Sequence, residues 1–221
     1  MIKIENIDAY GFDHAIRAMR NPMNSWDKSD SEWSPANWCD SIFTIGDDDM
    51  ALMQRLYKAG TEHRTYARMI YVWMDITAPL YWWKEMDRYT VGKSQVSCST
   101  MHKIAAKEFE FDDFSHEHLI DDEDEMFSDE ELFDYTAVIA LHALINNLNF
   151  WRNKYLKHKD KKYWWQMIQL LPSSYNQKRT ICMSYETVFK IIKERTGHKL
   201  NEWNEFVEIL KDLPYIREIV E

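Results

Sequence analysis

Glycine is scarce in this chain, and the spacing of its glycines excludes the common phosphate-binding loops. The five glycines stand far apart, at positions 11, 46, 60, 92 and 197. A P-loop or a dinucleotide-binding turn needs several glycines within a few residues, so the chain contains neither motif. Proline is equally scarce, with five residues, and we therefore expect no long flexible linker.

Hydrophobic periodicity predicts an α+β fold in which helices dominate, organised as one domain over residues 1–221. Alternating apolar residues predict strands over 1–8 and 69–76. Apolar residues at helical spacing predict helices over 10–20, 47–58, 80–88, 129–158, 159–171, 185–195 and 200–213. Polar, Pro- or Ser-rich composition predicts an ordered loop over 24–40, a loop or extended segment over 89–101 and irregular chain over 173–182. The run Asp47-Asp48-Asp49 is expected to cap its helix.

The acidic charge of the chain is concentrated in one segment. Residues 108–134 hold 14 acidic residues and no Lys or Arg, so a chain with a net charge of −10 has a remainder of +4. We interpret this segment as an insertion, and as a candidate lid or partner surface; a nucleic-acid mimic is the weaker alternative. The acidic net charge argues against the basic face that a phosphate-backbone binder needs, so we expect no direct nucleic-acid binding.

Cysteine usage and hydropathy indicate a cytoplasmic protein. The cysteines at 39, 98 and 182 are odd in number and widely spaced, which disfavours a disulfide framework or a zinc knuckle. The N-terminus lacks an apolar signal run, and the longest apolar stretch, 135–145, is too short to span a bilayer. His116 and His118 lie two residues apart among carboxylates, but that spacing alone is weak evidence for metal binding, and we predict no metal site.

Several short motifs, taken in order, resemble flavin-dependent thymidylate synthases. The first is Gly60-Thr61-Glu62-His63, followed by Ile76-Thr77-Ala78-Pro79-Leu80-Tyr81 and then an Arg before a Ser/Thr-rich segment. Further on come Leu171-Pro172, a helix ending at Arg195, His198 and Glu202-Trp203. The resemblance implies a helix-rich domain with a small antiparallel sheet, and FAD bound between subunits of a homotetramer. It also implies reduction by NADPH and transfer of a one-carbon unit from methylenetetrahydrofolate to dUMP, with a pyrimidine nucleotide as substrate.

The signature motif of that family is altered in this chain. Its Arg-His-Arg corresponds to Arg88-Tyr89-Thr90. Its Ser, Asn, Ser and final Arg fall on Lys93, Gln95, Cys98 and Thr100, although a one-residue shift would place Ser97 on the second Ser. Its later Asn and two nucleotide-binding Arg fall on Ser184, Glu186 and Ile168. Three Arg that hold the nucleotide in the family are thus replaced.

The resemblance, together with the need of phosphates for charged donors, gives three groups of candidate residues. The proposed catalytic residues are Arg88, Ser97 and Cys98. The proposed cofactor-binding residues are His63, Arg64, Arg88, Tyr89, Gln95 and Ser184. The proposed substrate-binding residues are Lys93, Ser97, Ser99, Thr100 and Arg179. Each has a plainer alternative: a surface Arg at a helix end, a hydrogen-bonded His, or a polar turn with an inert thiol. A Cys98–His102 nucleophile pair is a further alternative.

The paired tryptophans Trp82-Trp83 and Trp164-Trp165 are expected in the core, as is His142; stacking on a flavin or a base is the alternative for the tryptophans. Two functions remain open at this stage. The chain is either a divergent flavin-dependent thymidylate synthase, or a non-catalytic homologue that binds a nucleotide or a protein partner on the same scaffold.

Overall fold

The computed structural model describes residues 2–37, 40–120 and 136–220, and confirms the helix-rich α+β class. The chain divides into two compact units. Unit 1 comprises residues 1–3, 76–87 and 97–179, and unit 2 comprises residues 4–75, 88–96 and 180–221. The single domain inferred from the sequence stays a prediction, and each unit is described by itself.

A four-stranded sheet has the order β1-β4-β6-β5. Its strands are β1 (Lys3–Tyr10), β4 (Tyr71–Pro79), β6 (Asn176–Ser184) and β5 (Lys93–Ser97). The strands expected over 1–8 and 69–76 are therefore confirmed. The irregular chain expected over 173–182 is wrong, because most of it forms β6. This strand is polar in composition, but it pairs on both sides, with β4 and β5, and it buries Ile181 and Met183.

The loop expected over 24–40 is also wrong in part. It contains η2 (Trp26–Lys28) and β2 (Glu32–Asn37), and β2 pairs antiparallel with β3 (Asp40–Thr44). Pro35 indicated a loop, but a strand of a two-stranded ribbon has one unpaired edge and tolerates proline there. The Trp33–Phe43 pair, with ring centroids 5.2 Å apart, lies directly across the ribbon.

The helices of unit 2 pack apolar faces into one core. They are α1 (Phe12–Arg20), η1 (Asn21–Met23), α2 (Asp47–Lys58), η3 (Thr65–Arg68), α7 (Tyr185–Arg195), α8 (Asn201–Lys211) and α9 (Ile216–Val220). Ala15, Met53, Phe189 and Trp203 from four of these helices are at most 2% exposed. The sequence pattern predicted four of the helices and missed α9, which is only five residues long.

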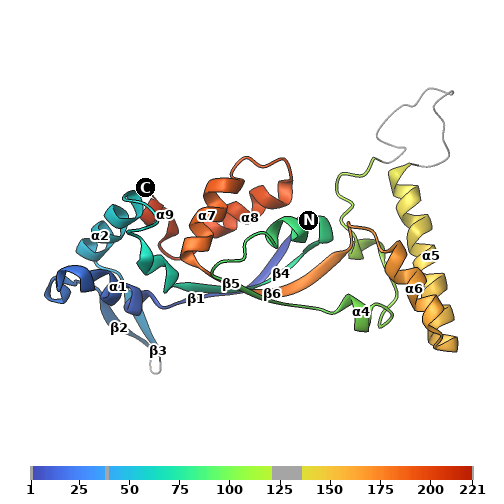
Figure 1. Ribbon diagram of the computed structural model, residues 1–221, viewed down its shortest axis with the longest axis horizontal. Coiled ribbons are helices and arrows are strands. Elements are labelled where there is room, and N and C mark those ends of the chain that lie inside the picture. Colours follow the sequence, from blue (N-terminus) through green and yellow to red (C-terminus); the bar gives the residue numbers. More distant parts are fainter. Residues whose placement is uncertain (1, 38–39, 121–135, 221) are drawn as a thin grey trace. The chain divides into compact units, whose positions relative to one another are not determined.

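Unit 1 is built around two adjacent helices, α5 (Ala137–His158) and α6 (Lys161–Leu170), which run alongside one another (Figure 1). Its other helical elements are α3 (Leu80–Met86), α4 (Thr100–Lys103) and η4 (Phe111–Asp113). Phe109 and Phe114, at the start of the acidic stretch, are buried with Leu148 and Met167 in one cluster. The rest of that stretch, and the start of the helix expected from 129, lie largely outside the described residues.

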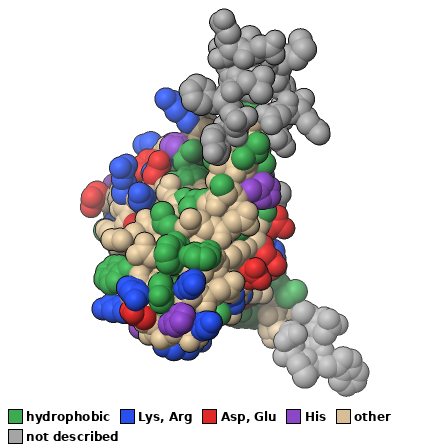
Figure 2. Space-filling model, turned by 90° about the vertical axis from the view of Figure 1, so that its right-hand side faces the viewer, with side chains coloured by type: hydrophobic (Ala, Val, Ile, Leu, Met, Phe, Trp, Pro, Cys, Tyr) green, Lys and Arg blue, Asp and Glu red, His purple; other side chains and the backbone are tan. Residues whose placement is uncertain are grey.

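The tryptophan pairs differ in burial. Trp82 and Trp83 are fully buried as expected. In the second pair, Trp164 is partly buried against the cluster of unit 1, but Trp165 is 42% exposed, so the core placement is wrong for Trp165. His142 is also exposed and stacks on Phe111 at 4.6 Å. Apolar and aromatic side chains of α5 and α6 thus remain on the surface, with Phe150, Leu156 and Leu170 exposed as well. Figure 2 shows such side chains interspersed with Lys and Arg. No described helix has the length and apolarity needed to cross a bilayer.

A buried carboxylate ties the start of α2 to the chain before the β2–β3 ribbon. Asp49, expected to cap α2, instead lies in the interior with no exposed surface. It accepts hydrogen bonds from Arg20, from Ser29 at 2.6 Å and from Ser31 at 2.7 Å. The cap comes from Asp30, which accepts from the backbone N–H groups of residues 48 and 49. Burial raises the pKa of Asp49, but the serine hydroxyls and Arg20 outweigh it, and the net pKa lies below the usual value.

We predict that Asp49→Asn lowers the free energy of unfolding by about 3 kcal/mol, because Arg20 is then left buried without its counter-charge. Urea unfolding measures this change, with Asp48→Asn on the exposed side of the same turn as the control. Since the folded pKa of Asp49 lies below the unfolded value of about 4, its stabilisation is present above that pH and disappears as the pH falls through the folded pKa. The Asn variant should lack this part of the acid dependence. Equal stability of the two variants would contradict the account.

Candidate functional site

A hollow of about 400 Å³ opens in unit 2 at the N-terminal end of α7. Three segments form it: the turn after α2 with the end of η3, the chain that enters β5, and the first turns of α7. Its walls consist of Thr61, Arg68, Arg88, Tyr89, Thr90, Val91, Glu186, Thr187 and Lys190. Two of the residues inferred for cofactor binding, Arg88 and Tyr89, thus line one cavity.

Cations dominate the rim of this hollow. Arg68 and Arg88 are exposed, and neither forms an ion pair with any residue that the structure describes. Lys190 lies over the ring of Tyr89 at 5.7 Å, and its Nζ is 4.0 Å from a carboxylate oxygen of Glu194. Guanidinium groups are planar, permanently charged donors that suit phosphate oxygens. The rim therefore presents positive charge to the solvent.

The one acidic residue of the lining, Glu186, is neutralised from outside the hollow. Arg64 donates two hydrogen bonds to its carboxylate, at 2.7 and 3.1 Å. The guanidinium of Arg64 also lies 5.0 Å from the ring centre of Tyr57 and 5.7 Å from that of Phe189. Both charged side chains are largely buried, at 15% and 18% exposure, so this bidentate pair is well held. Arg64, inferred from the sequence to bind cofactor, pairs with Glu186 and cancels its charge.

The N-terminus of α7 is fixed to the chain that enters β5. Ser184, the N-cap residue, is 2% exposed, and its hydroxyl accepts from the backbone N–H of Thr187. Thr187 Oγ1 donates to the carbonyl oxygen of Val91 at 2.9 Å, and Ser184 N donates to that of Gly92 at 2.8 Å. The structure thus gives Ser184 a capping role at the base of the hollow, and its hydroxyl is held 3.1 Å from Thr187 Oγ1.

Tyr89 contributes its ring to the wall while its hydroxyl is engaged elsewhere. The hydroxyl donates to Glu194 at 3.0 Å and accepts from Arg195 Nε at 2.9 Å. Burial raises the pKa of Tyr89, so the phenol stays protonated at neutral pH. Arg195 in turn lies over Trp203 at 4.4 Å. With Tyr89 and Glu186 both engaged, the described lining presents cations but offers no free carboxylate or imidazole for proton transfer.

The remaining cofactor candidates lie apart from this hollow within unit 2. His63 is exposed and lines a second hollow of about 630 Å³ together with Arg20, Arg55 and Glu62. Gln95 lies on β5, where its side-chain oxygen accepts from Lys93 Nζ at 3.3 Å.

Apart from Lys93, which lies on β5 in unit 2, the other candidates for substrate binding and catalysis lie in unit 1. Arg179 lies over Trp83 at 4.3 Å and donates to Asp87 and to Gln177, each at 2.9 Å. Gln177 also donates to the carbonyl oxygen of Cys98 at 2.9 Å. Cys98 is exposed, as are its neighbours toward β5. This group thus brings Arg179 and Cys98 to the same end of β6.

The turn that follows Cys98 contains the last two substrate candidates. Ser99 caps the short helix α4 by accepting from the backbone N–H of His102 at 3.1 Å. Thr100 is the first residue of that helix, and Ser97 is the last of β5 and exposed. Among the described residues, no group of three or more His, Cys, Asp or Glu side chains could hold a metal ion.

No protein-family model matches this chain, and no curated protein matches it. Solved structures, in contrast, do match it. Thymidylate synthase X from Helicobacter pylori, with FAD and dUMP, is similar at a TM-score of 0.66 and 19% identity over 100% of this chain and 97% of that chain. The fold is that of a flavin-dependent thymidylate synthase. The UMP/dUMP methylase PolB from Streptomyces cacaoi, bound with 5-Br UMP, is similar at a TM-score of 0.62 and 12% identity, covering 99% of this chain and 93% of that chain.

Two cations of the hollow were missed from the sequence. Arg68 ends η3, and Lys190 lies one turn after Glu186 on α7. The spacing of Glu186 and Lys190 would have placed them on one helix face, but only the fold brings that face beside η3.

We predict that Gly92→Ala lowers the free energy of unfolding more than Gly60→Ala does, because only the first variant disturbs the base of the hollow. Both glycines have positive φ, +67° and +103°, so both variants carry backbone strain of about 1 kcal/mol. A Cβ at Gly92 would lie 2.6 Å from Ser184 Oγ, whereas one at Gly60 meets nothing. Displacing the cap of α7 should lower the free energy of unfolding of Gly92→Ala by a further amount of about 1 kcal/mol, measured by urea unfolding. Equal losses in the two variants would show that the close approach at Gly92 is unimportant.

Proposed function

We propose that the hollow at the N-terminus of α7 binds the diphosphate of FAD, and that the protein is a flavoprotein acting on a pyrimidine nucleotide. The observation that carries this proposal is the pair of exposed guanidinium groups of Arg68 and Arg88, which face one cavity with no ion pair among the described residues. Glu186 does not oppose an anion there, because Arg64 neutralises it. The similar Helicobacter pylori enzyme was solved with FAD and dUMP.

The residues present fit such a cofactor. Arg68, Arg88 and Lys190 would bind the diphosphate, and the hydroxyls of Thr61 and Thr90 lie in the same lining. The N-terminus of α7 adds a favourable dipole for an anion. Bound FAD would supply redox chemistry, and the chain's own residues would hold and orient it. Ser184 would act on this site through its cap, whereas His63 and Gln95, which lie apart from the hollow, would contact other parts of the cofactor.

We further propose that the protein catalyses the reaction of flavin-dependent thymidylate synthases, the methylation of dUMP to dTMP with methylenetetrahydrofolate and NADPH. It would do so as a cytoplasmic homotetramer. Arg179 is the cation of unit 1 proposed for the nucleotide phosphate, and Lys93, in unit 2, stays a sequence prediction for the same ligand. The hydroxyls of Ser97, Ser99 and Thr100, with Cys98, would contact the rest of the nucleotide. The alternative is a non-catalytic homologue, and the engaged side chains of Tyr89 and Glu186 favour it. Anaerobic oxidation of the reduced flavin by methylenetetrahydrofolate plus dUMP, followed by absorbance, separates the two.

We predict that Arg88→Gln and Arg68→Gln each weaken FAD binding about tenfold or more, because a charged hydrogen bond to phosphate contributes roughly 1.5–3 kcal/mol. Calorimetric titration of the purified protein with FAD measures the change. Arg17→Gln, an exposed Arg of α1 outside the hollow, is the matched control. Unchanged affinity in both hollow variants would remove the proposed diphosphate site, and absence of FAD binding in the unaltered protein would refute the flavoprotein proposal.

The Arg64–Glu186 pair gives a second prediction. Arg64→Gln alone should weaken FAD binding about tenfold, because it exposes the ligand to an uncompensated carboxylate. Glu186→Gln alone should bind FAD at least as tightly as the unaltered protein. The double variant should recover most of the loss, since neither charge remains. If the double variant binds as weakly as Arg64→Gln, the charge of Glu186 is not what Arg64 controls.

A further inference from the structure

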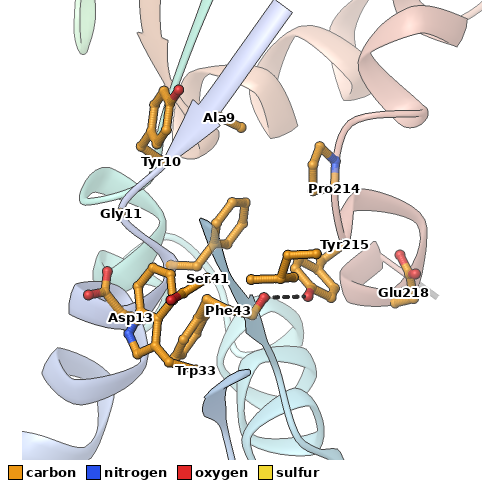
Figure 3. Close-up of a pocket in the computed structure, with 12 residues that line it drawn as sticks. Ala9, Tyr10, Gly11, Asp13, Trp33, Ser41, Phe43, Pro214, Tyr215 and Glu218 are labelled. Atoms are coloured by element: carbon orange, nitrogen blue, oxygen red, sulfur yellow. Dashed lines mark hydrogen bonds between the residues drawn. The ribbon is translucent and has the colours of Figure 1, made fainter. Parts of the chain in front are cut away.

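Another cavity in unit 2 has a lining of the opposite charge to the hollow at the N-terminus of α7. It encloses about 510 Å³ between the end of β1, the β2–β3 ribbon and the chain before α9. Figure 3 shows the residues that line it. They are Ala9, Tyr10, Gly11, Phe12, Asp13, Trp33, Ser41, Ile42, Phe43, Pro214, Tyr215 and Glu218. Five of them are aromatic, two are acidic, and none is Lys, Arg or His.

The aromatic rings come from separate segments of the chain, one pair packed edge to face and the other tilted. Phe12 and Tyr215 have centroids 5.4 Å apart with planes at 72°. Trp33 and Phe43 have centroids 5.2 Å apart with planes at 55°. The side chains of Trp33, Phe43 and Tyr215 converge in Figure 3, where the hydroxyl of Tyr215 donates to the carbonyl oxygen of Phe43 at 3.3 Å. The arrangement thus presents several ring faces to one space.

Backbone strain supports the idea that the position of Tyr215 is specified. Its φ of +62° is unfavourable for a bulky residue and persists only where the surroundings hold it. The preceding Pro214 carbonyl accepts a hydrogen bond from the buried Tyr185 hydroxyl at 3.0 Å, which fixes the turn. The turn therefore holds the ring of Tyr215 against the cavity.

The charge of the lining selects the class of ligand. Aromatic faces carry negative electrostatic potential and attract cations. Asp13 and Glu218 stand on opposite sides of the ring cluster in Figure 3, and neither forms an ion pair with a described residue. We propose that this cavity binds a small organic cation, such as a quaternary or protonated amine whose apolar groups pack on Trp33, Phe43 and Tyr215.

The test compares a cation with its uncharged carbon isostere. Choline and 3,3-dimethylbutan-1-ol have nearly the same shape and differ in charge, so calorimetry or saturation-transfer NMR on the full chain isolates the electrostatic contribution. Choline should bind about tenfold or more tightly than the alcohol. Failure of choline to bind, or equal binding of the two probes, overturns the proposal.

Two pairs of variants locate the binding. Trp33 is 57% exposed, so Trp33→Leu should fold and should weaken choline binding severalfold, whereas Trp26→Leu, outside the cavity, should not. Glu218→Gln should weaken it as well, and Glu205→Gln on α8 should not. Unchanged affinity in both cavity variants overturns the assignment. If Trp33→Leu instead dissociates an oligomer and choline binding is absent, the surface is an interface between copies and the proposal fails.

Discussion

The bidentate ion pair between Arg64 and Glu186 determines the charge of the hollow at the N-terminus of α7, called here the cationic hollow. Without it, a carboxylate on the first turn of α7 would stand among the lining residues and repel any phosphate. With it, the free guanidinium groups of Arg68 and Arg88 set the sign of the potential. The pair is largely buried and its Arg rests on two aromatic rings, so water screens it less than a surface pair. The proposed diphosphate site depends on this neutralisation.

The sequence predicted the long elements because their apolar residues recur at helical or alternating spacing, as in α7 and β4. It missed β6 and the β2–β3 ribbon because pairing with neighbouring strands, rather than composition, holds those segments extended. The resemblance identified Arg88 and Tyr89 as candidate residues. It did not identify the role of Arg64, because that role depends on a contact with Glu186 across 122 positions of the chain. Long-range contacts of this kind have no signature in a single sequence.

Two of the hollows described in unit 2 have linings of opposite charge. The cationic hollow is built on the N-terminus of α7, where the backbone dipole and Arg side chains favour an anion. The aromatic cavity is built from the β2–β3 ribbon and the turn at Tyr215, and its lining has only acidic charges. A ligand that suits one is disfavoured in the other. The proposal for FAD and the proposal for an organic cation can therefore be tested independently.

The most direct measurement of the central claim is an experimental structure of the protein with bound FAD. The account predicts that the diphosphate lies at the N-terminus of α7, within hydrogen-bonding distance of Arg68 and Arg88, with Arg64 still paired to Glu186. A diphosphate found elsewhere, for example in the hollow beside His63, or an Arg64 that leaves Glu186 to contact the cofactor, would contradict it.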